Sequence, residues 1–345
     1  MNPLRSLRPL VLCCSALIAG AAWAQSSAAV VRTEFLADPP PTLSSHASTI
    51  CETKEGLVAS WFGGTAERQR DVVIWFSRYE KGAWTRPAQV ARGDEDGDEQ
   101  WACWNPVLVQ PKKGPLLLYY KVGPSPSEWW GRVTTSEDGG VHWAKSKRLP
   151  RGIIGPVRNK PVALSDEIYL CGASDESSGW RVHMETVRQP GGTAPTWSRT
   201  PELNSPLEFG AIQPTILVWP DLGIQILCRT RQNLLSESWS VDGGKTWSKM
   251  RRTDIPNPNS AVDAVMLKDG RALLVYNPTT ENRHSLGVAI IEGAQKWHHA
   301  INLEDDEGEY SYPAVIQTND GQVHITYTWK REKIKHVVLD PSQLK

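Results

Sequence analysis

Short runs of apolar and β-branched residues alternate with polar, glycine-containing segments along almost the whole chain. Most runs are bounded by Gly, Pro, Asn or Asp, which favour turns, and none keeps the periodicity of an amphipathic helix over a useful length. Representative runs are GLVASWFGG at 56–64, PLLLYYKVG at 115–123, IQILCRTR at 224–231 and RALLVYN at 271–277. The pattern predicts an all-β fold of short antiparallel strands.

Two segments share one turn pattern, SEDGGVHW at 136–143 and SVDGGKTW at 240–247. Both fit S-x-D-x-G-x-x-W, which is typical of a hairpin in which the Asp side chain accepts backbone N–H groups and Gly adopts a positive φ. The Trp is expected to pack beneath the loop. We therefore interpret Asp138 and Asp242 as turn residues and not as catalytic carboxylates.

Weaker copies of this turn end at Trp84, Trp197 and Trp297, so the terminal tryptophans recur about every fifty residues. A period of that size, filled by short strands, is typical of one four-stranded propeller blade. Five such turns leave space for a sixth blade, which the two chain ends would close. The sequence predicts a six-bladed β-propeller of four-stranded antiparallel blades, as a single domain over 35–340.

The N-terminus has the features of a secretory signal peptide. Arg5 and Arg8 precede an apolar run, which ends in the small-residue pattern Ala-Trp-Ala. We expect a signal peptide over 1–24, removed after Ala24, and a short lead at 25–34. The mature protein would then be secreted or periplasmic, and no later segment reaches the ~18 apolar residues that a membrane span needs.

Four cysteines remain after the expected cleavage point, and no pair has the CxxC spacing of a zinc or redox motif. Disulfide formation in an oxidising compartment and burial as small apolar residues both remain open. The four are Cys51, Cys103, Cys171 and Cys228.

The charge balance excludes several function classes. The chain has 38 Lys and Arg against 38 Asp and Glu, so no basic excess indicates nucleic acid. Dinucleotide, phosphate-loop, zinc-protease and serine-hydrolase motifs are absent, and we expect no cofactor, no metal and no obligatory protein partner.

The acidic run at 93–99 is interpreted as a solvated loop. Sixteen Trp against four Phe suit clefts that bind carbohydrate.

These aspartate turns (Asp-boxes) on a six-bladed propeller resemble the sialidase (neuraminidase) superfamily over essentially the whole mature chain. The strings WFGG, WNP, NKP, NPNS and YSYP further resemble a widespread branch of sialidase-like proteins. Enzymes of that superfamily hold the sialic acid carboxylate with three arginines. A tyrosine polarised by a glutamate is their nucleophile and an aspartate is their acid/base.

The resemblance implies roles for residues of the first blade, where the chain departs from the family pattern. The family's first arginine opens this blade, and His46 takes its place. The family's acid/base aspartate follows about 25 residues later, which indicates Asp71, just before an expected strand at 72–76.

The resemblance also assigns two arginines and a second departure. Arg229 and Arg283 match the family's other carboxylate-binding arginines, with Arg231 a near neighbour of the first. The glutamate that polarises the nucleophile is replaced by Gln213, and a neutral amide cannot take the phenolic proton.

Tyr310 fits the nucleophile position. Thr328 stands where the family has a glutamate that braces the first arginine. The arginine and its brace are therefore lost together, which indicates a rebuilt site that includes His46. Glu185 or Glu176 is a possible substitute for the lost activating glutamate.

Polar and aromatic residues at other expected strand ends are candidates for substrate binding, because sugars need neutral donors, acceptors and flat apolar faces. They are Trp104, Asn105, Lys121, Asn159, Lys160, Asn259 and Asp263.

Three functions remain open at this stage, each with an acidic oligosaccharide or glycoconjugate as ligand. Arg229 and Arg283 can clamp a carboxylate, with His46 either as a cationic third arm or as a neutral base. A retaining exo-glycosidase would use Tyr310 as nucleophile and Asp71 as acid/base. A polysaccharide lyase would use His46 as base and Tyr310 as acid. A lectin would bind the acidic sugar without turnover.

Overall fold

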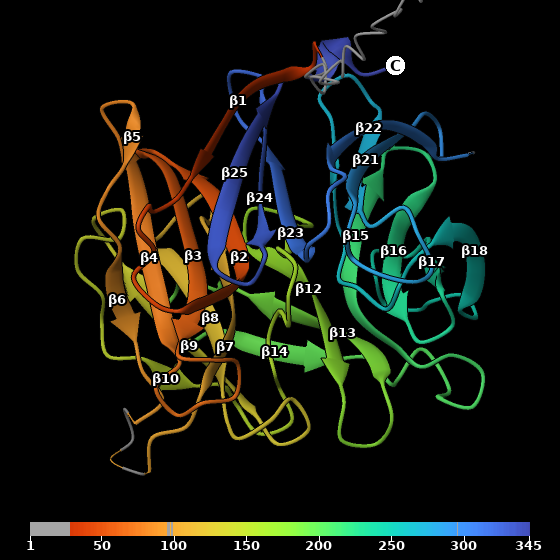
Figure 1. Cartoon of the computed structure of the whole chain (residues 1–345). Helices are drawn as coiled ribbons and strands as arrows, with labels where there is room; N and C mark the ends of the chain where they lie inside the picture. The colour runs from red at the N-terminus through yellow and green to blue at the C-terminus, as the bar shows by residue number, and fades with distance from the viewer. Residues whose placement is uncertain (1–27, 95–96, 98, 295) are drawn as a thin grey trace, which may run out of the picture.

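The computed structural model describes residues 28–94, 97, 99–294 and 296–345. Its strands form six antiparallel sheets, and the sheet order confirms the predicted six-bladed β-propeller (Figure 1). Five of the sheets contain four strands each, arranged in order from the axis outward. The sheet of the first blade has a fifth strand, β6, which pairs with β4. Within these residues the only helix is a 3-10 turn, η1 (Pro341–Gln343). The expected signal peptide at 1–24 lies outside the described residues.

The strand bounds follow blade by blade. Blade one contains β2 (Ser44–Thr53), β3 (Gly56–Gly64), β4 (Val73–Glu80), β5 (Ala83–Trp84) and β6 (Ala88–Ala91). Blade two contains β7 (Cys103–Val109), β8 (Leu116–Val122), β9 (Trp130–Ser136) and β10 (Lys147–Arg148). Blade three contains β11 (Val162–Ala163), β12 (Ile168–Asp175), β13 (Arg181–Arg188) and β14 (Thr196–Arg199).

The second half of the chain continues the same order. Blade four contains β15 (Ala211–Trp219), β16 (Gly223–Thr230), β17 (Leu234–Ser240) and β18 (Arg251–Pro256). Blade five contains β19 (Asp263–Met266), β20 (Ala272–Tyr276), β21 (Leu286–Ile291) and β22 (His298–Glu304). Blade six contains β23 (Tyr310–Gln317), β24 (Val323–Trp329), β25 (Lys333–Leu339) and, from the N-terminus, β1 (Val30–Phe35).

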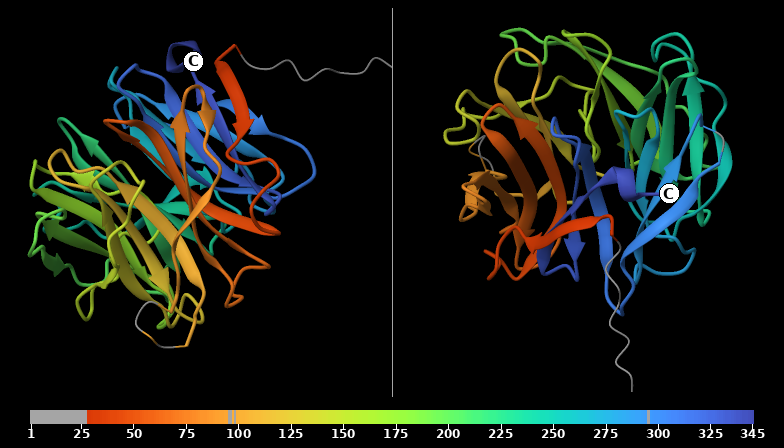
Figure 2. Two further views of the ribbon diagram at one scale, coloured as in Figure 1. Left: turned by 90° about the vertical axis from the view of Figure 1, so that its left-hand side faces the viewer. Right: turned by 90° about the horizontal axis from the view of Figure 1, so that it is seen from above.

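The two chain ends close the ring in blade six. β1 pairs with β25 from Val30–Leu339 to Phe35–Lys335, and both views of Figure 2 keep the red N-terminal strand beside the blue C-terminal strands. The propeller therefore begins at or before Val30, inside the segment 25–34 that the sequence assigned to a lead. Half-buried and exposed residues alternate in β1, the pattern of an outer strand packed on one face only.

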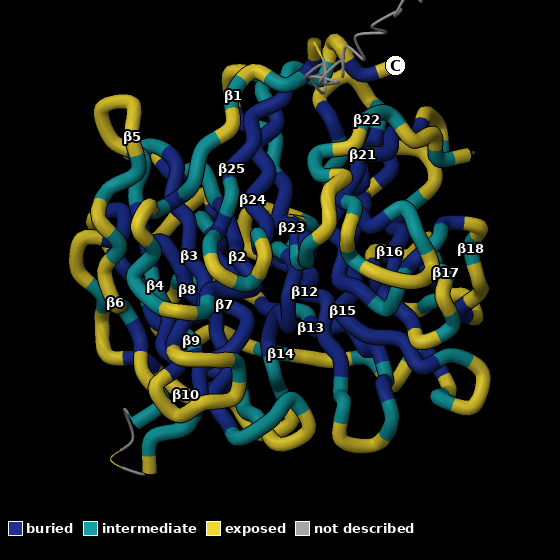
Figure 3. Tube along the Cα trace, viewed as in Figure 1, coloured by how far each residue is buried: buried dark blue, intermediate teal, exposed yellow. Residues whose placement is uncertain are grey.

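The hydrophobic core lies between neighbouring blades. One buried cluster joins blades one and two, and further clusters join each successive pair around to blades six and one. Figure 3 shows the consequence, with buried strands inside and exposed connecting loops. Each blade is a sheet that needs a partner on both faces, so the ring must close before its core is complete.

The repeated turn has the predicted geometry. Asp138 Oδ1 accepts hydrogen bonds from the backbone N–H groups of residues 141 and 142, and Asp242 Oδ1 does the same for residues 245 and 246. Trp143 donates its indole N–H to the carbonyl of Gly140 and packs against Phe76 of the preceding blade. The turn therefore anchors one blade to the next.

The first strand of several blades has an irregularity at the same place. The pairing register shifts at the start of β2, β7, β15 and β23. At these points Ala47, Asn105, Gln213 and Tyr312 have φ of 54°, 36°, 56° and 54°. Bulges of this kind bend the strand and redirect side chains, and they are common beside active sites.

No helix in the described part of the chain is long and apolar enough to cross a membrane. Cys51, Cys171 and Cys228 are free thiols, and Cys103, Cys171 and Cys228 are buried.

Candidate active site

Arginines from three blades surround one tyrosine, Tyr312, near the start of β23. The guanidinium carbons of Arg158, Arg229 and Arg283 lie 5.4, 5.8 and 5.8 Å from the centre of its ring. Arg158 precedes β11 in blade three, Arg229 lies on β16 in blade four, and Arg283 lies between β20 and β21 in blade five. Since Tyr312 belongs to blade six, the cluster brings together residues far apart in sequence at the propeller axis.

Neutral groups orient Arg229. Its Nε donates to Asn259 Oδ1 at 2.7 Å, and its Nη1 donates to Gln213 Oε1 at 3.3 Å and to the Tyr312 hydroxyl oxygen at 2.9 Å. Its guanidinium also lies over the ring of Trp180, 5.1 Å from the centroid. Because these partners are uncharged, they fix the side chain without cancelling its charge, which stays available to an anion.

Arg158 braces the backbone beneath Tyr312. Its Nη2 donates to the carbonyl oxygens of Tyr312 and Pro313, while its Nε and Nη1 are buried without a partner in the described structure. Burial lowers the pKa of Arg158 to about 10, which still leaves it charged at neutral pH. This arginine holds the bulge of β23 in place and adds positive charge below the ring.

Glu309 links two arginines at the edge of the cluster. It accepts from Arg283 Nη1 at 3.0 Å and from Arg331 Nε at 2.7 Å, and Arg331 also pairs with Glu67 at 2.5 Å. Burial alone would raise the pKa of Glu309. The hydrogen bond from Arg331 and the positive charges of Arg331 and Arg283 outweigh it and lower that pKa.

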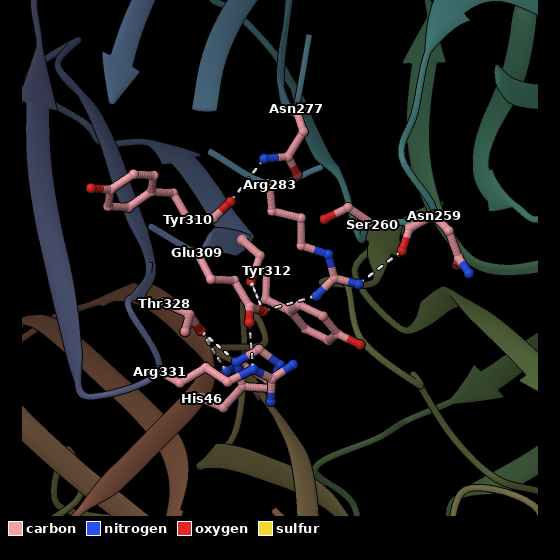
Figure 4. Close-up of polar contacts among 12 residues, drawn as sticks. His46, Asn259, Ser260, Asn277, Arg283, Glu309, Tyr310, Tyr312, Thr328 and Arg331 are labelled. Atoms are coloured by element: carbon pink, nitrogen blue, oxygen red, sulfur yellow. Dashed lines mark hydrogen bonds and ion pairs between the residues drawn. The ribbon is translucent and has the colours of Figure 1, made fainter. Parts of the chain in front are cut away.

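His46 lies against the same tyrosine, but it is not a cationic arm. It is 1% exposed, and its ring centre is 4.2 Å from that of Tyr312. Burial, followed by the charges of Arg331, Arg283, Arg158 and Arg229, holds the pKa of His46 well below its ordinary value. His46 is therefore neutral at physiological pH. Figure 4 shows His46 among the labelled side chains of the cluster, with Thr328 beside it.

The hydrogen bonds of His46 leave one ring nitrogen free. Its Nδ1 pairs with Thr328 Oγ1 at 2.9 Å, and the backbone N–H of Ala47 donates to the same oxygen at 3.1 Å. Its Nε2 is buried and has no partner among the described residues. The hydroxyl group of Thr328 therefore holds the imidazole in place.

The structure does not bring Tyr310 to this cluster. Its ring is 1% exposed and belongs to the apolar core between blades five and six, and Figure 4 shows it pointing away from Tyr312 and the arginines. The bulge at 311–314 sends the two tyrosines in different directions. We therefore replace Tyr310 by Tyr312 as the candidate reactive phenol. The signal in the sequence was the following proline, which also follows Asn105 and Gln213 at the matching bulges.

Asp71, the predicted acid/base, forms hydrogen bonds within its own loop. It is exposed, and its Oδ2 accepts from the backbone N–H and the hydroxyl group of Thr65 at 2.8 and 2.5 Å. Glu67, in the same loop, instead contacts Arg331 of the cluster. The loop therefore contacts the site through Glu67, whereas the carboxylate of Asp71 is hydrogen-bonded to Thr65.

Glu176, in the turn between β12 and β13, is a half-buried carboxyl group. Burial raises the pKa of its carboxyl group, although the charges of Arg229 and Arg231 act in the opposite direction.

Three of the predicted substrate-binding residues form a structural hub instead. Asp263 accepts from Lys160 Nζ at 2.9 and 3.0 Å, from Thr215 Oγ1 at 2.8 Å and from the backbone N–H of Val315 at 2.9 Å. These contacts join blades three, four, five and six. Asn159 donates to the Gln213 carbonyl at 3.1 Å, so it also links blades.

The remaining predicted residues take different places. Asn259 contacts Arg229 directly and accepts from Arg283 through its carbonyl, so it belongs to the cluster. Lys121 is buried away from it and donates to the carbonyl of Pro156, and burial lowers the pKa of Lys121 to about 7. Trp104 packs its ring between Phe62 and Trp129.

Asn105 lies at the bulge of blade two, buried, with φ of 36°. Among the candidates that the sequence indicated, Arg229, Arg283, His46, Gln213 and Asn259 are brought together. Sequence reasoning missed Tyr312, Arg158, Arg331 and Glu309. Within the described ranges, no group of three or more metal-ligating side chains is present.

Comparisons with known proteins agree with this fold. The family model of the BNR repeat-like domain matches residues 55–325. An anhydrosialidase of Macrobdella decora is 21% identical over 261 residues, which is 69% of this chain and 30% of that protein. The chain thus spans less than a third of the length of this curated relative.

Solved structures show the same architecture at low identity. A protein of unknown function from Dyadobacter fermentans DSM 18053 superimposes with a TM-score of 0.72 and 17% identity, covering 90% of this chain and 98% of that one. The Hadza microbial sialidase Hz136 gives a TM-score of 0.72 and 15% identity, covering 88% and 67%. This chain belongs to the BNR repeat-like domain family.

Proposed function

We propose that this protein is a glycosidase that releases an acidic sugar, a sialic or uronic acid, from the end of a glycan. The observation that carries the proposal is the set of guanidiniums of Arg158, Arg229 and Arg283 around the ring of Tyr312. The arginines would attract the negative charge of an acidic sugar. The phenol of Tyr312 would then lie beside the bound sugar, where it can act as a nucleophile. The relatives named as sialidases support a glycosidase of this superfamily.

The charge of the cluster favours a carboxylate ligand. Among the described residues, the hydrogen-bond partners of Arg229 are neutral, and two nitrogens of Arg158 have no partner. Arg283 and Arg331 share Glu309, so the arginines outnumber the carboxylates that bind them. In a chain with zero formal net charge, this local excess attracts an anion, and guanidiniums bind carboxylates in two-point geometry.

The proposed reaction uses Tyr312 as nucleophile. The Tyr312 hydroxyl gives its proton to the neutral imidazole of His46, whose ring lies against it, and regains that proton when the glycosyl–tyrosine is hydrolysed. The Tyr312 oxygen forms a bond to the anomeric carbon as the glycosidic C–O bond breaks, and Arg229, which donates to that oxygen, stabilises the negative charge on it. Glu176 gives its proton to the departing oxygen. Water then attacks the glycosyl–tyrosine and Glu176 takes back a proton, so that the sugar leaves with retained configuration.

A second candidate is a lyase, because His46 is a neutral base with a free Nε2 and the family's activating glutamate is absent. His46 would remove the proton beside a uronate carboxylate held by Arg229 and Arg283. Tyr312 would protonate the leaving oxygen, and the elimination would form a carbon–carbon double bond in the uronate ring.

The test is a screen of purified protein, from residue 25 onward, against sialosides and uronate oligosaccharides. Release of a saturated acidic monosaccharide that stops in Tyr312→Phe supports the glycosidase. Ultraviolet absorbance of an unsaturated uronate would establish the lyase instead. Binding without turnover, unchanged in Tyr312→Phe, would mean a lectin. From the leader pattern at 1–24 we also propose that the protein acts outside the cytoplasm.

A further inference from the structure

A pocket of about 630 Å³ lies between blades two and three, outside the arginine cluster. Its walls include the residues from 126 to 130, the residues from 148 to 154 and the turn after β12. Adjacent strands of a blade run in opposite directions, so the start of β9 and the end of β12 lie at the same end of the propeller as the starts of the first strands. The pocket therefore opens on the same face as Tyr312.

The pocket combines flat apolar faces with unsatisfied polar atoms. Trp129 and Trp130 contribute indole rings, and the guanidinium of Arg148 lies 4.6 Å from the ring centre of Trp130. Within the described residues, Trp130 Nε1 and His183 Nδ1 are buried without a partner. His183 is 2% exposed, and its Nε2 pairs with Glu185 Oε1 at 3.0 Å, so its ring is fixed in this orientation. A sugar hydroxyl can donate to or accept from such atoms.

The charge at the pocket is positive. Arg148 and Arg151 are exposed, and neither has an ion-pair partner in the part of the chain that the structure describes. The carboxylate of Asp175, which also lines the pocket, accepts hydrogen bonds from the backbone N–H and the hydroxyl group of Ser177 at 2.7 and 2.6 Å. Two free guanidiniums beside aromatic faces suit a sugar that carries a carboxylate or sulfate.

The turn between β12 and β13 separates the two sites. Glu176 lies on the side of the cluster, where Arg229 and Arg231 act on its carboxyl group. Its neighbours in sequence, Asp175 and Ser177, line the pocket. A chain of sugars bound at the arginine cluster would cross this turn to reach the pocket.

We infer that this pocket binds a further sugar residue of an acidic oligosaccharide whose terminal residue occupies the arginine cluster. The inference rests on the proposed function in taking the central ligand to be an acidic sugar. It adds that the natural substrate is a polyanionic chain and not a single acidic sugar on a neutral carrier.

The experiment compares a monosaccharide, glucuronic acid, with a hyaluronan tetrasaccharide, whose glucuronates alternate with neutral sugars, by calorimetry. The test variant is Arg148→Ala with Arg151→Ala, and the control is Arg252→Ala, an exposed arginine of blade four. We expect the wild type to bind the tetrasaccharide at least tenfold more tightly than the monosaccharide. The double variant should lose that gain and keep its monosaccharide affinity, because one lost charged hydrogen bond is worth about tenfold or more.

Three outcomes would overturn the inference. They are an equal affinity for tetrasaccharide and monosaccharide in the wild type, a tetrasaccharide affinity that the double variant retains, and equally tight binding of the neutral cellotetraose. Circular dichroism of each variant confirms folding. Because the readout is binding, it stays valid if the protein turns over neither sialosides nor uronates. Turnover combined with an unchanged tetrasaccharide affinity would refute the second site alone.

Discussion

The choice between two tyrosines two residues apart is the sharpest test of the site. Tyr312→Phe removes the phenolic oxygen that Arg229 contacts at 2.9 Å and leaves the ring between its neighbours. Tyr310→Phe removes an oxygen whose ring is part of the core between blades five and six. We expect the first change to abolish turnover and the second to preserve it, because only Tyr312 faces the arginines.

The magnitudes separate catalysis from folding. Losing one hydrogen bond between Arg229 and Tyr312 costs about 1.5–3 kcal/mol of local interaction, and Arg229 keeps its bonds to Asn259 and Gln213. The variant should therefore stay folded. Removing a hydroxyl group that acts as nucleophile or acid lowers kcat by about 10²–10⁴-fold, more than a modest loss of stability can imitate at a temperature where both proteins are folded.

The assay is steady-state kinetics on the best substrate from the screen, with thermal unfolding of each variant as the control. A Tyr312→Phe enzyme that keeps more than about a tenth of the wild-type kcat would refute the reasoning, since the expected loss is at least about 100-fold. So would a Tyr310→Phe enzyme that melts like the wild type and yet loses turnover to the same extent.

Three further predictions concern other charged groups. Because a general acid must be protonated and burial raises the pKa of Glu176, kcat/KM should fall as pH rises through that pKa. Glu176→Gln should remove this limb of the pH profile, whereas Asp71→Asn should leave it. Asp263→Asn should lower the free energy of unfolding in urea by about 3 kcal/mol with KM unchanged, because Lys160 loses its partner. Burial lowers the pKa of His324 to about 4, so the unfolded chain takes up a proton near pH 6.5 and the folded one only near pH 4. The free energy of unfolding should therefore decrease by up to about 3 kcal/mol as pH falls through that window, and His324→Gln should flatten the slope.

The fold was predictable because its signals are local and repeated. The aspartate turns of Asp138 and Asp242 fix the blade period, and the apolar runs between them fix the strands. The closing strand at Val30–Phe35 was missed because an outer strand buries only one face and has a weak apolar pattern. The sixth blade itself followed from the space left by the other five.

The site was predictable only in part, because side-chain direction at a bulge cannot be read from strand alternation. In a regular strand Tyr310 and Tyr312 would share a face, so the sequence alone gave no reason to prefer the second. The bulge at 311–314 separates them. Arg158 was missed because its role depends on contacts with the backbone of blade six, about 150 residues away in sequence.

The departures at His46 and Thr328 make physical sense once the other arginines are located. Losing the family's first arginine removes one positive charge from the site, but Arg158 and Arg331 add guanidiniums at positions that the family pattern does not specify. Their charges, with burial, keep His46 neutral, so an imidazole at this place costs no further repulsion. A neutral residue in turn needs no anionic brace, and the hydroxyl group of Thr328 suffices to hold it. A glutamate at 328 would instead place a carboxylate beside an imidazole whose pKa burial and the arginines hold low, and its charge would offset the positive charge that the anionic sugar requires. The two replacements are therefore coupled, and restoring the glutamate alone should weaken binding of an acidic sugar.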